Sequence, residues 1–317
     1  MRVSVVTTMY RSAPYLEEFH RRASEAAARL GVEAEFVYVN DGSPDDALAV
    51  ALRLRERDGR VRVVDLSRNF GHHPAMMAGL EHATGERVFL IDCDLEEAPE
   101  LLEAFWAKLD ETGADVAHGV QRERQGGLAS RLLGWAYYKT VDLLSTEALP
   151  RNLMTVRLMT RRYVDALLSH PETEFIIAGL WSRTGFEQVP VEVDKRQKGS
   201  TTYTLARKLS HLANTITAFS SKPLYLIFWL GLAVSLVSAA LAGFFVVRRL
   251  FFVEMPVGWP LLAVSLWLLG GLIMLSQGVL GIYLAKVYSE VKRRPRTIVR
   301  AVHQPTGGAH ERQRRAA

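Results

Sequence analysis

Short apolar runs alternate with longer polar and amphipathic stretches in the N-terminal part of the chain. Four runs, at residues 3–6, 34–39, 61–66 and 88–91, have the length and composition of buried strands. The stretches between them open near Pro or Ser residues, which favour the first turn of a helix. This strand–helix alternation predicts an α/β fold with a mostly parallel sheet and helices on both faces.

Individual helix starts follow from local chemistry. Ser12 is predicted to lie near the N-cap of the first helix, and Ser43 is predicted to be the N-cap of the second. Pro74 and Pro99 are predicted to open the next two helices. Residues 114–118 are predicted to form a fifth strand, whereas residues 121–200 have a less regular pattern.

Polar residues follow each of the first four predicted strands. In parallel sheets, ligands bind outside the carboxyl ends of the strands. No Gly-x-Gly-x-x-Gly follows the first strand and the chain has no Walker loop, so the pattern disfavours dinucleotide-binding and P-loop proteins. The clusters expected at this edge are residues 7–10, Asp41, Arg68 with Asn69, and Asp92 with Asp94.

The fourth predicted strand ends in the sequence Asp92-Cys93-Asp94. Two carboxylates at such an end can hold a hard divalent cation, Mg²⁺ or Mn²⁺, that bridges the phosphates of a substrate. A plainer interpretation is that both acids only start the turn before the next helix. His72 and His73 are interpreted as ordinary loop residues, because no Cys/His spacing predicts a zinc site.

Two long stretches carry no charged residue. Residues 224–247 comprise 24 such positions and residues 257–285 comprise 29. Each exceeds the roughly 20 residues that a helix needs to span a bilayer. The connector between them is short, so we expect a membrane hairpin of two helices. The preceding residues 206–221 have one apolar helical face, which predicts an amphipathic helix in the membrane interface.

Positive charge is concentrated at the C-terminus. Residues 286–317 contain nine basic and two acidic residues, a net charge of +7, whereas the preceding residues sum to −2. Because basic flanks favour the cytoplasmic side, the N-terminal part and both termini are predicted to be cytoplasmic in an integral membrane protein. A basic tail beside a membrane favours anionic headgroups over nucleic acid, for which no reader motif is present. The single cysteine, Cys93, excludes an intrachain disulfide and fits a reducing compartment.

Together these motifs resemble family 2 glycosyltransferases of the GT-A fold. Within that family the chain resembles the polyisoprenyl-phosphate glycosyltransferases, the group that includes dolichol-phosphate mannose synthases. Coverage runs from residue 3 to about residue 290 and includes the hairpin. The matching segments are residues 5–10, 39–43, 66–71, 92–95, 157–159, 196–203 and 219–223.

The resemblance implies transfer of a sugar from a nucleotide sugar to a polyisoprenyl phosphate, undecaprenyl or dolichyl, usually with inversion. It implies that Asp92 and Asp94 handle the diphosphate through Mg²⁺ or Mn²⁺ and that both are catalytic. Binding of the nucleotide sugar would involve Thr7, Tyr10, Asp41, Arg68 and Asp92. Contacts to the lipid phosphate or the diphosphate would involve Arg124, Arg196, Lys198 and Thr155.

The chain departs from the family pattern at several positions. A Thr replaces the usual Pro after the first strand, Thr202 replaces a Lys, and Thr155-Val156 replaces Asp-Phe. The change at Thr155 does not predict a dead enzyme. A phosphate monoester has a second pKa of about 6, so the acceptor is already mostly dianionic at neutral pH and needs little help from a base.

The predicted organisation has four parts. They are a cytoplasmic transferase domain (1–204), an interfacial helix (205–222), two membrane helices (223–286) and a basic, partly disordered tail (287–317). Two other functions stay open: a polysaccharide synthase, which usually carries a Gln-x-x-Arg-Trp motif absent here, and a membrane scaffold with a decayed transferase domain. The oligomeric state is open, with a homo-oligomer as one option. The donor sugar, its base and the lipid length are not determined by these motifs.

Overall fold

The computed structural model describes residues 1–121, 153–173, 175, 177–193, 222–251 and 258–304. The chain divides into two compact units. The first contains residues 1–126, 149–202 and 294–317, and the second contains residues 127–148 and 203–293.

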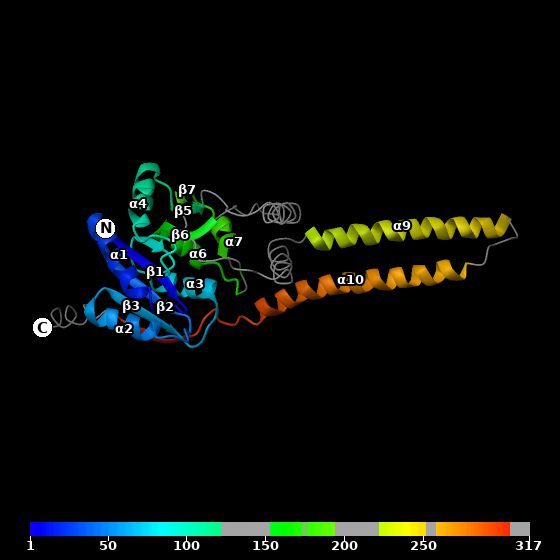
Figure 1. The fold of residues 1–317 in the computed structure, drawn as a ribbon. Helices are drawn as coiled ribbons and strands as arrows, with labels where there is room; N and C mark the ends of the chain where they lie inside the picture. Colours follow the sequence, from blue (N-terminus) through cyan, green and yellow to red (C-terminus); the bar gives the residue numbers. More distant parts are fainter. Residues whose placement is uncertain (122–152, 174, 176, 194–221, 252–257, 305–317) are drawn as a thin grey trace. The chain divides into compact units, whose positions relative to one another are not determined.

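The first unit is built on one eight-stranded sheet with the strand order β7-β5-β6-β4-β1-β2-β3-β8. Figure 1 shows the sheet with its connecting helices. The strands are β1 (Arg2–Met9), β2 (Glu33–Asn40), β3 (Val61–Leu66), β4 (Arg87–Leu90), β5 (Val116–Gln121), β6 (Leu153–Thr160), β7 (Gln188–Val193) and β8 (Val299–His303).

Parallel pairing holds where the sequence pattern is most regular. β4, β1, β2 and β3 pair in parallel, and so do β5 and β7. β6 lies antiparallel between β4 and β5, and β8 lies antiparallel to β3. The sheet is therefore mixed, and the prediction of a mostly parallel sheet applies to its centre.

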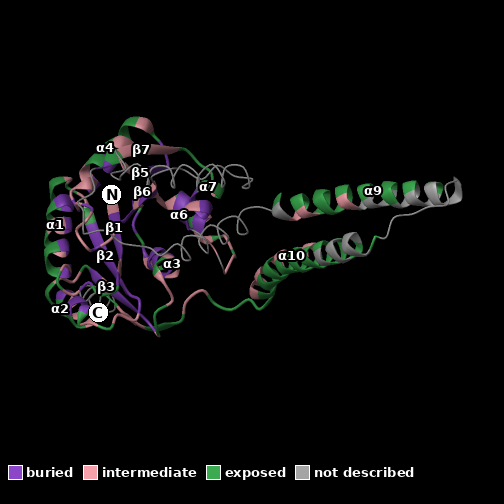
Figure 2. Ribbon diagram, turned by 45° about the vertical axis from the view of Figure 1, so that its right-hand side comes forward, coloured by how far each residue is buried: buried purple, intermediate pink, exposed green. Residues whose placement is uncertain are grey.

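Helices cover both faces of the sheet, as predicted. One face packs against α1 (Leu16–Arg29), α2 (Ala47–Arg57) and α4 (Leu101–Thr112), and the other against α3 (His72–His82), α6 (Arg161–Leu168) and α7 (Ile177–Arg183). Strand residues alternate between the two cores, with Val5 facing one and Val6 the other. Figure 2 shows the resulting buried strands between the helices.

The register of the central strands aligns their carboxyl ends. Met9 pairs with Asn40, Asn40 with Asp65, and Val6 with Leu90. The segments that follow β1, β2, β3 and β4 therefore leave the sheet at one edge, where the sequence predicts ligand binding.

All four predicted helix starts differ from the observed ones. α3 begins at His72 instead of Pro74, and α4 begins at Leu101 instead of Pro99. The N-cap of α1 is Tyr15 instead of Ser12, whose hydroxyl instead bonds to the backbone of Tyr10. The N-cap of α2 is Asp46 instead of Ser43, whose hydroxyl accepts the backbone N–H of Arg11. Both serines fix loops at the carboxyl edge, because their side chains can bond locally to backbone as readily as they cap a helix.

The second unit contains the long apolar helices α9 (Lys222–Phe251) and α10 (Trp259–Val291), which lie side by side in Figure 1. Among the described residues, one segment, Leu268–Val291, is long and apolar enough to cross a membrane. An apolar stretch of α9, Leu224–Val234, is shorter. The described residues thus support one span and do not confirm the predicted two-helix hairpin. The predicted interfacial helix lies almost entirely outside the described residues.

Candidate active site

The two acids after β4 lie at the carboxyl edge as predicted. The backbone N–H of Glu96 donates to Asp94 Oδ1 at 3.0 Å, and Leu95 between them has a positive φ of 63°. A non-glycine residue with such a backbone is uncommon and marks a tightly held turn. The side chain of Asp92 is 31% exposed, so its carboxylate can reach a ligand.

His72 connects the ends of two strands. Its Nδ1 lies 3.0 Å from Thr8 Oγ1 near the end of β1, and its Nε2 lies 3.4 Å from Asp92 Oδ1 beyond β4. His72 is the first residue of α3, so the interpretation of His72 as a loop residue is wrong. The sequence signal that could have identified it is its position directly after Gly71, at the carboxyl edge of β3.

Asp41 holds the loop that leads into α3. Its carboxylate is almost fully buried and accepts the backbone N–H groups of Phe70 at 2.7 Å and Gly71 at 3.1 Å. Burial raises the pKa of Asp41, and the two N–H donors oppose that rise. His72 follows Gly71 directly and contacts Asp92, so polar contacts link the loop that Asp41 holds to the turn that contains Asp92.

A very close backbone contact joins the loops after β2 and β3. Gly42 has a φ of +58°, and a Cβ atom there would lie 2.4 Å from Asn69 N and 2.6 Å from Arg68 C. Asp45 then joins this region to the loop after β1, because its Oδ2 accepts the N–H of Ala13 at 2.9 Å. Three loops from three neighbouring strands are thereby fixed to one another.

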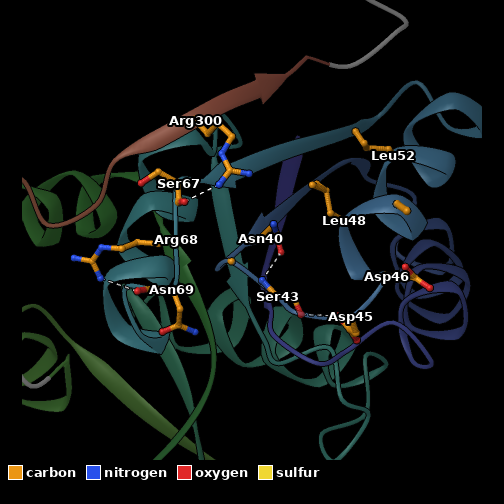
Figure 3. Close-up of a pocket in the computed structure, with 12 residues that line it drawn as sticks. Asn40, Ser43, Asp45, Asp46, Leu48, Leu52, Ser67, Arg68, Asn69 and Arg300 are labelled. Carbon is orange, nitrogen blue, oxygen red and sulfur yellow. Dashed lines mark hydrogen bonds between the residues drawn. The ribbon is translucent and has the colours of Figure 1, made fainter.

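A cavity of about 580 Å³ opens beside these loops. Figure 3 shows its polar wall, which the loops after β2 and β3 and strand β8 supply together. The polar side chains that line the cavity include those of Asn40, Ser43, Asp45, Arg68, Asn69 and Arg300. The volume falls in the range of small-molecule sites, about 300–1,000 Å³.

The other residues predicted to bind the nucleotide sugar differ in exposure to solvent. Tyr10 is 46% exposed at the end of β1, and Arg68 is exposed with its guanidinium 4.0 Å from the centroid of the Phe70 ring. Thr7 is fully buried and lies beside the Cys93 thiol. Their contacts to a donor stay predictions, and Tyr10 and Arg68 are the two whose exposure suits direct contact.

Thr155 reaches the same edge on β6. Thr155 lies two residues before Arg157, which pairs with Leu90, the last residue of β4. Arg157 is completely buried, and its Nε donates to Thr155 O at 3.2 Å. Its guanidinium lies over the Trp181 ring. Burial lowers the pKa of Arg157 to about 9, which still leaves a cation at neutral pH.

A comparison with protein-family models identifies the family of the chain. Residues 4–168 match the model of glycosyl transferase family 2. The chain belongs to that family.

Curated relatives match over nearly the whole length of this family 2 glycosyltransferase. A Mycobacterium tuberculosis protein whose name places it among glycosyltransferases is 50% identical over 96% of this chain and 89% of its own. A bactoprenol glucosyl transferase of Shigella flexneri prophage origin is 32% identical over 96% and 99%. A Klebsiella pneumoniae undecaprenyl-phosphate 4-deoxy-4-formamido-L-arabinose transferase is 31% identical over 99% and 97%.

The carboxylates at the family 2 site are suited to binding a divalent cation. Within the described residues no three His, Cys, Asp or Glu side chains cluster as a complete protein cage. Mg²⁺ is commonly held by one or two carboxylates and completed by substrate phosphates and water. Asp92 and Asp94 can supply those carboxylates. Arg124, Arg196 and Lys198 lie outside the described residues, so their assignment to phosphate stays a prediction.

Proposed function

We propose that this glycosyltransferase moves a sugar from a nucleotide sugar to a polyisoprenyl phosphate at a membrane surface. The observation that carries the proposal is the length of the match to the bactoprenol and undecaprenyl-phosphate transferases, 96% and 99% of this chain. That match extends far beyond residue 168, where the family domain ends, and so includes the apolar helices.

The carboxylate pair would meet the charge that forms when the donor breaks. Cleavage of the sugar–phosphate bond leaves negative charge on a nucleoside diphosphate, and a divalent cation held by Asp92 and Asp94 would neutralise it as a Lewis acid. His72 positions Asp92 in this account, because it joins that carboxylate to Thr8. Tyr10, Asp41 and Arg68 would form or support the nucleoside side of the site.

The acceptor phosphate would approach from the β6 side of the same edge. A neutral Thr155 there does not repel a dianionic phosphate, whereas an aspartate would. Positioning and charge neutralisation supply most of the rate when the nucleophile is already ionised. Arg124, Arg196 and Lys198, which lie outside the described residues, are proposed to bind phosphate.

The sheet topology supports a membrane hairpin with an even number of crossings. β8 follows α10 in the chain, yet it pairs with β3 in the same sheet as β1 and β2. Because the polypeptide leaves this unit before α9 and rejoins it after α10, one crossing alone would separate β8 from β3. If Leu268–Val291 spans the bilayer, a second crossing is needed, and we propose that α9 supplies it.

This arrangement predicts that only the segment connecting α9 to α10 is outside the cytoplasm. After Cys93→Ser, a cysteine at exposed Gly258 should react with an impermeant maleimide added to intact cells. A cysteine at exposed Ala28, on α1, should react only after permeabilisation. The reverse labelling pattern would contradict the proposed topology.

The proposed activity is tested with membranes and a panel of radiolabelled nucleotide sugars. One of the donors should yield label that extracts into chloroform–methanol and requires added polyisoprenyl phosphate. Label that accumulates only in an aqueous or insoluble polymer would favour a polysaccharide synthase. The absence of transfer from every donor in the panel would favour a decayed transferase domain.

A further inference from the structure

The last described strand of the chain joins the donor side of the active-site edge. β8 pairs antiparallel with β3, and Ser67 N donates to Ile298 O at 2.8 Å where the β3–α3 loop begins. At the other end of β8, Arg55 Nε of α2 donates to Gln304 O at 2.6 Å. A segment that the sequence pattern assigned to a basic tail is therefore held to two elements that line the cavity.

Arg300 of β8 makes two contacts at the base of that loop. Its Nη2 donates to Ser67 O at 2.6 Å, and its Nη1 lies 3.4 Å from Asp65 Oδ2. Figure 3 shows Arg300 reaching Ser67 from the strand that crosses above the cavity. The Asp65 side chain is only 5% exposed, whereas that of Arg300 is 60% exposed. Burying a carboxylate costs free energy unless it has a charged or hydrogen-bonding partner. The guanidinium of Arg300 gives Asp65 a partner that is charged and can donate a hydrogen bond.

Asp65 connects Arg300 to the loop after β2 through hydrogen bonds. Its Oδ1 accepts Asn40 Nδ2 at 2.7 Å, and Asn40 Oδ1 accepts Ser43 N at 3.1 Å. The hydroxyl of Ser43 in turn accepts Arg11 N at 2.7 Å, beyond β1. A continuous series of polar contacts thus runs from β8 through two buried strand ends to the loops of the site.

We infer that Arg300 is a positioning residue for binding of the nucleoside diphosphate part of the donor. It holds Ser67 directly, and it holds the loop containing Asp41 and Gly42 through Asp65 and Asn40. The inference rests on the proposed function for the identity of the donor. It also means that the donor site is complete only when the chain has returned from the membrane helices, since Arg300 follows α10.

The test compares Arg300→Ala and Arg300→Lys with the wild-type full chain in nanodiscs. Arg300→Ala should raise the KM for the nucleotide sugar roughly tenfold, with the KM for polyisoprenyl phosphate and kcat within about twofold. Lysine keeps the charge and can still donate to Ser67 O, so Arg300→Lys should recover part of the affinity. Arg53→Ala, which removes an exposed arginine from α2, is the matched control and should leave all three constants unchanged.

Calorimetric titration with UDP and GDP in the presence of Mg²⁺ separates this inference from the proposed acceptor. If the wild type binds either nucleotide, Arg300→Ala should weaken that binding about tenfold whether or not a polyisoprenyl phosphate is the acceptor. Unchanged nucleotide affinity in Arg300→Ala, or an equal loss in Arg53→Ala, would overturn the role of Arg300. Thermal melting shows whether Arg300→Ala folds. If it does not fold, Arg300→Lys is the deciding variant, and its affinity for the nucleotide must be weaker than that of the wild type but still measurable. A wild type that binds neither nucleotide would overturn the inference together with the proposed donor.

Discussion

Asp94→Ala is expected to lower sugar transfer by on the order of a thousandfold while the fold is retained. Asp94 follows a buried strand end, and its turn is fixed by the N–H of Glu96 and by the positive φ of Leu95. Its carboxylate has no role in either hydrophobic core, so its removal should cost little stability. The loss arises because the charge on the departing diphosphate is no longer neutralised.

Asp94→Asn separates charge from local structure. An asparagine oxygen can still accept the N–H of Glu96, yet it is a much poorer ligand for a hard cation than a carboxylate. We therefore expect Asp94→Asn to be nearly as inactive as Asp94→Ala, and chelation of divalent cations to abolish wild-type turnover. Asp165→Ala, which removes an exposed acid from α6, is the control and should keep full activity. Full transfer by Asp94→Asn, or after exhaustive chelation, would contradict the metal assignment.

Gly42→Ala is expected to lower kcat/KM for the donor by roughly tenfold to a hundredfold. The new Cβ would stand 2.4 Å from Asn69 N, and backbone cannot move aside as a flexible side chain can. The positive φ adds strain, and strain of this kind costs on the order of 1–3 kcal/mol. If the loops separate to relieve it, Asn69 and Arg68 shift away from Asp41, and donor binding weakens.

Gly31→Ala provides a matched comparison. Gly31 has a φ of +65°, but a Cβ atom there would meet no heavy atom within 4 Å. Both variants should lose some thermal stability because of the unfavourable φ, and only Gly42→Ala should have a lower kcat/KM for the donor. Equal kinetic constants for the two variants would show that the close approach at Gly42 does not matter for the donor site.

The part of the fold that the sequence predicts well is the part with local signals. Each central strand is a short apolar run, and each ends in polar residues that the register then brings to one edge. The positions of Asp41, Asp92 and Asp94 at that edge follow from the strand–helix alternation alone. Their roles toward donor and metal remain predictions, because the fold fixes where a carboxylate lies and not what it binds.

The parts that were missed depend on long-range pairing. β8 has the sequence Val-Arg-Ala-Val-His within a basic segment, and its strand conformation comes from an edge of β3 more than 230 residues away. β6 lies in the region where the sequence pattern is irregular, so its antiparallel pairing with β4 and β5 was not indicated. His72 and Arg300 were missed for the same reason, since each acquires its contacts through tertiary structure.

The most direct test of the central claim uses purified enzyme in nanodiscs with a defined acceptor. The enzyme is supplied with its radiolabelled donor and either a polyisoprenyl phosphate or the matching polyisoprenol without phosphate. We predict one labelled sugar per lipid phosphate, a product that stays in the organic phase, and no transfer to the alcohol. Equal labelling of the alcohol, or label in a sugar polymer independent of either lipid, would contradict a polyisoprenyl-phosphate acceptor.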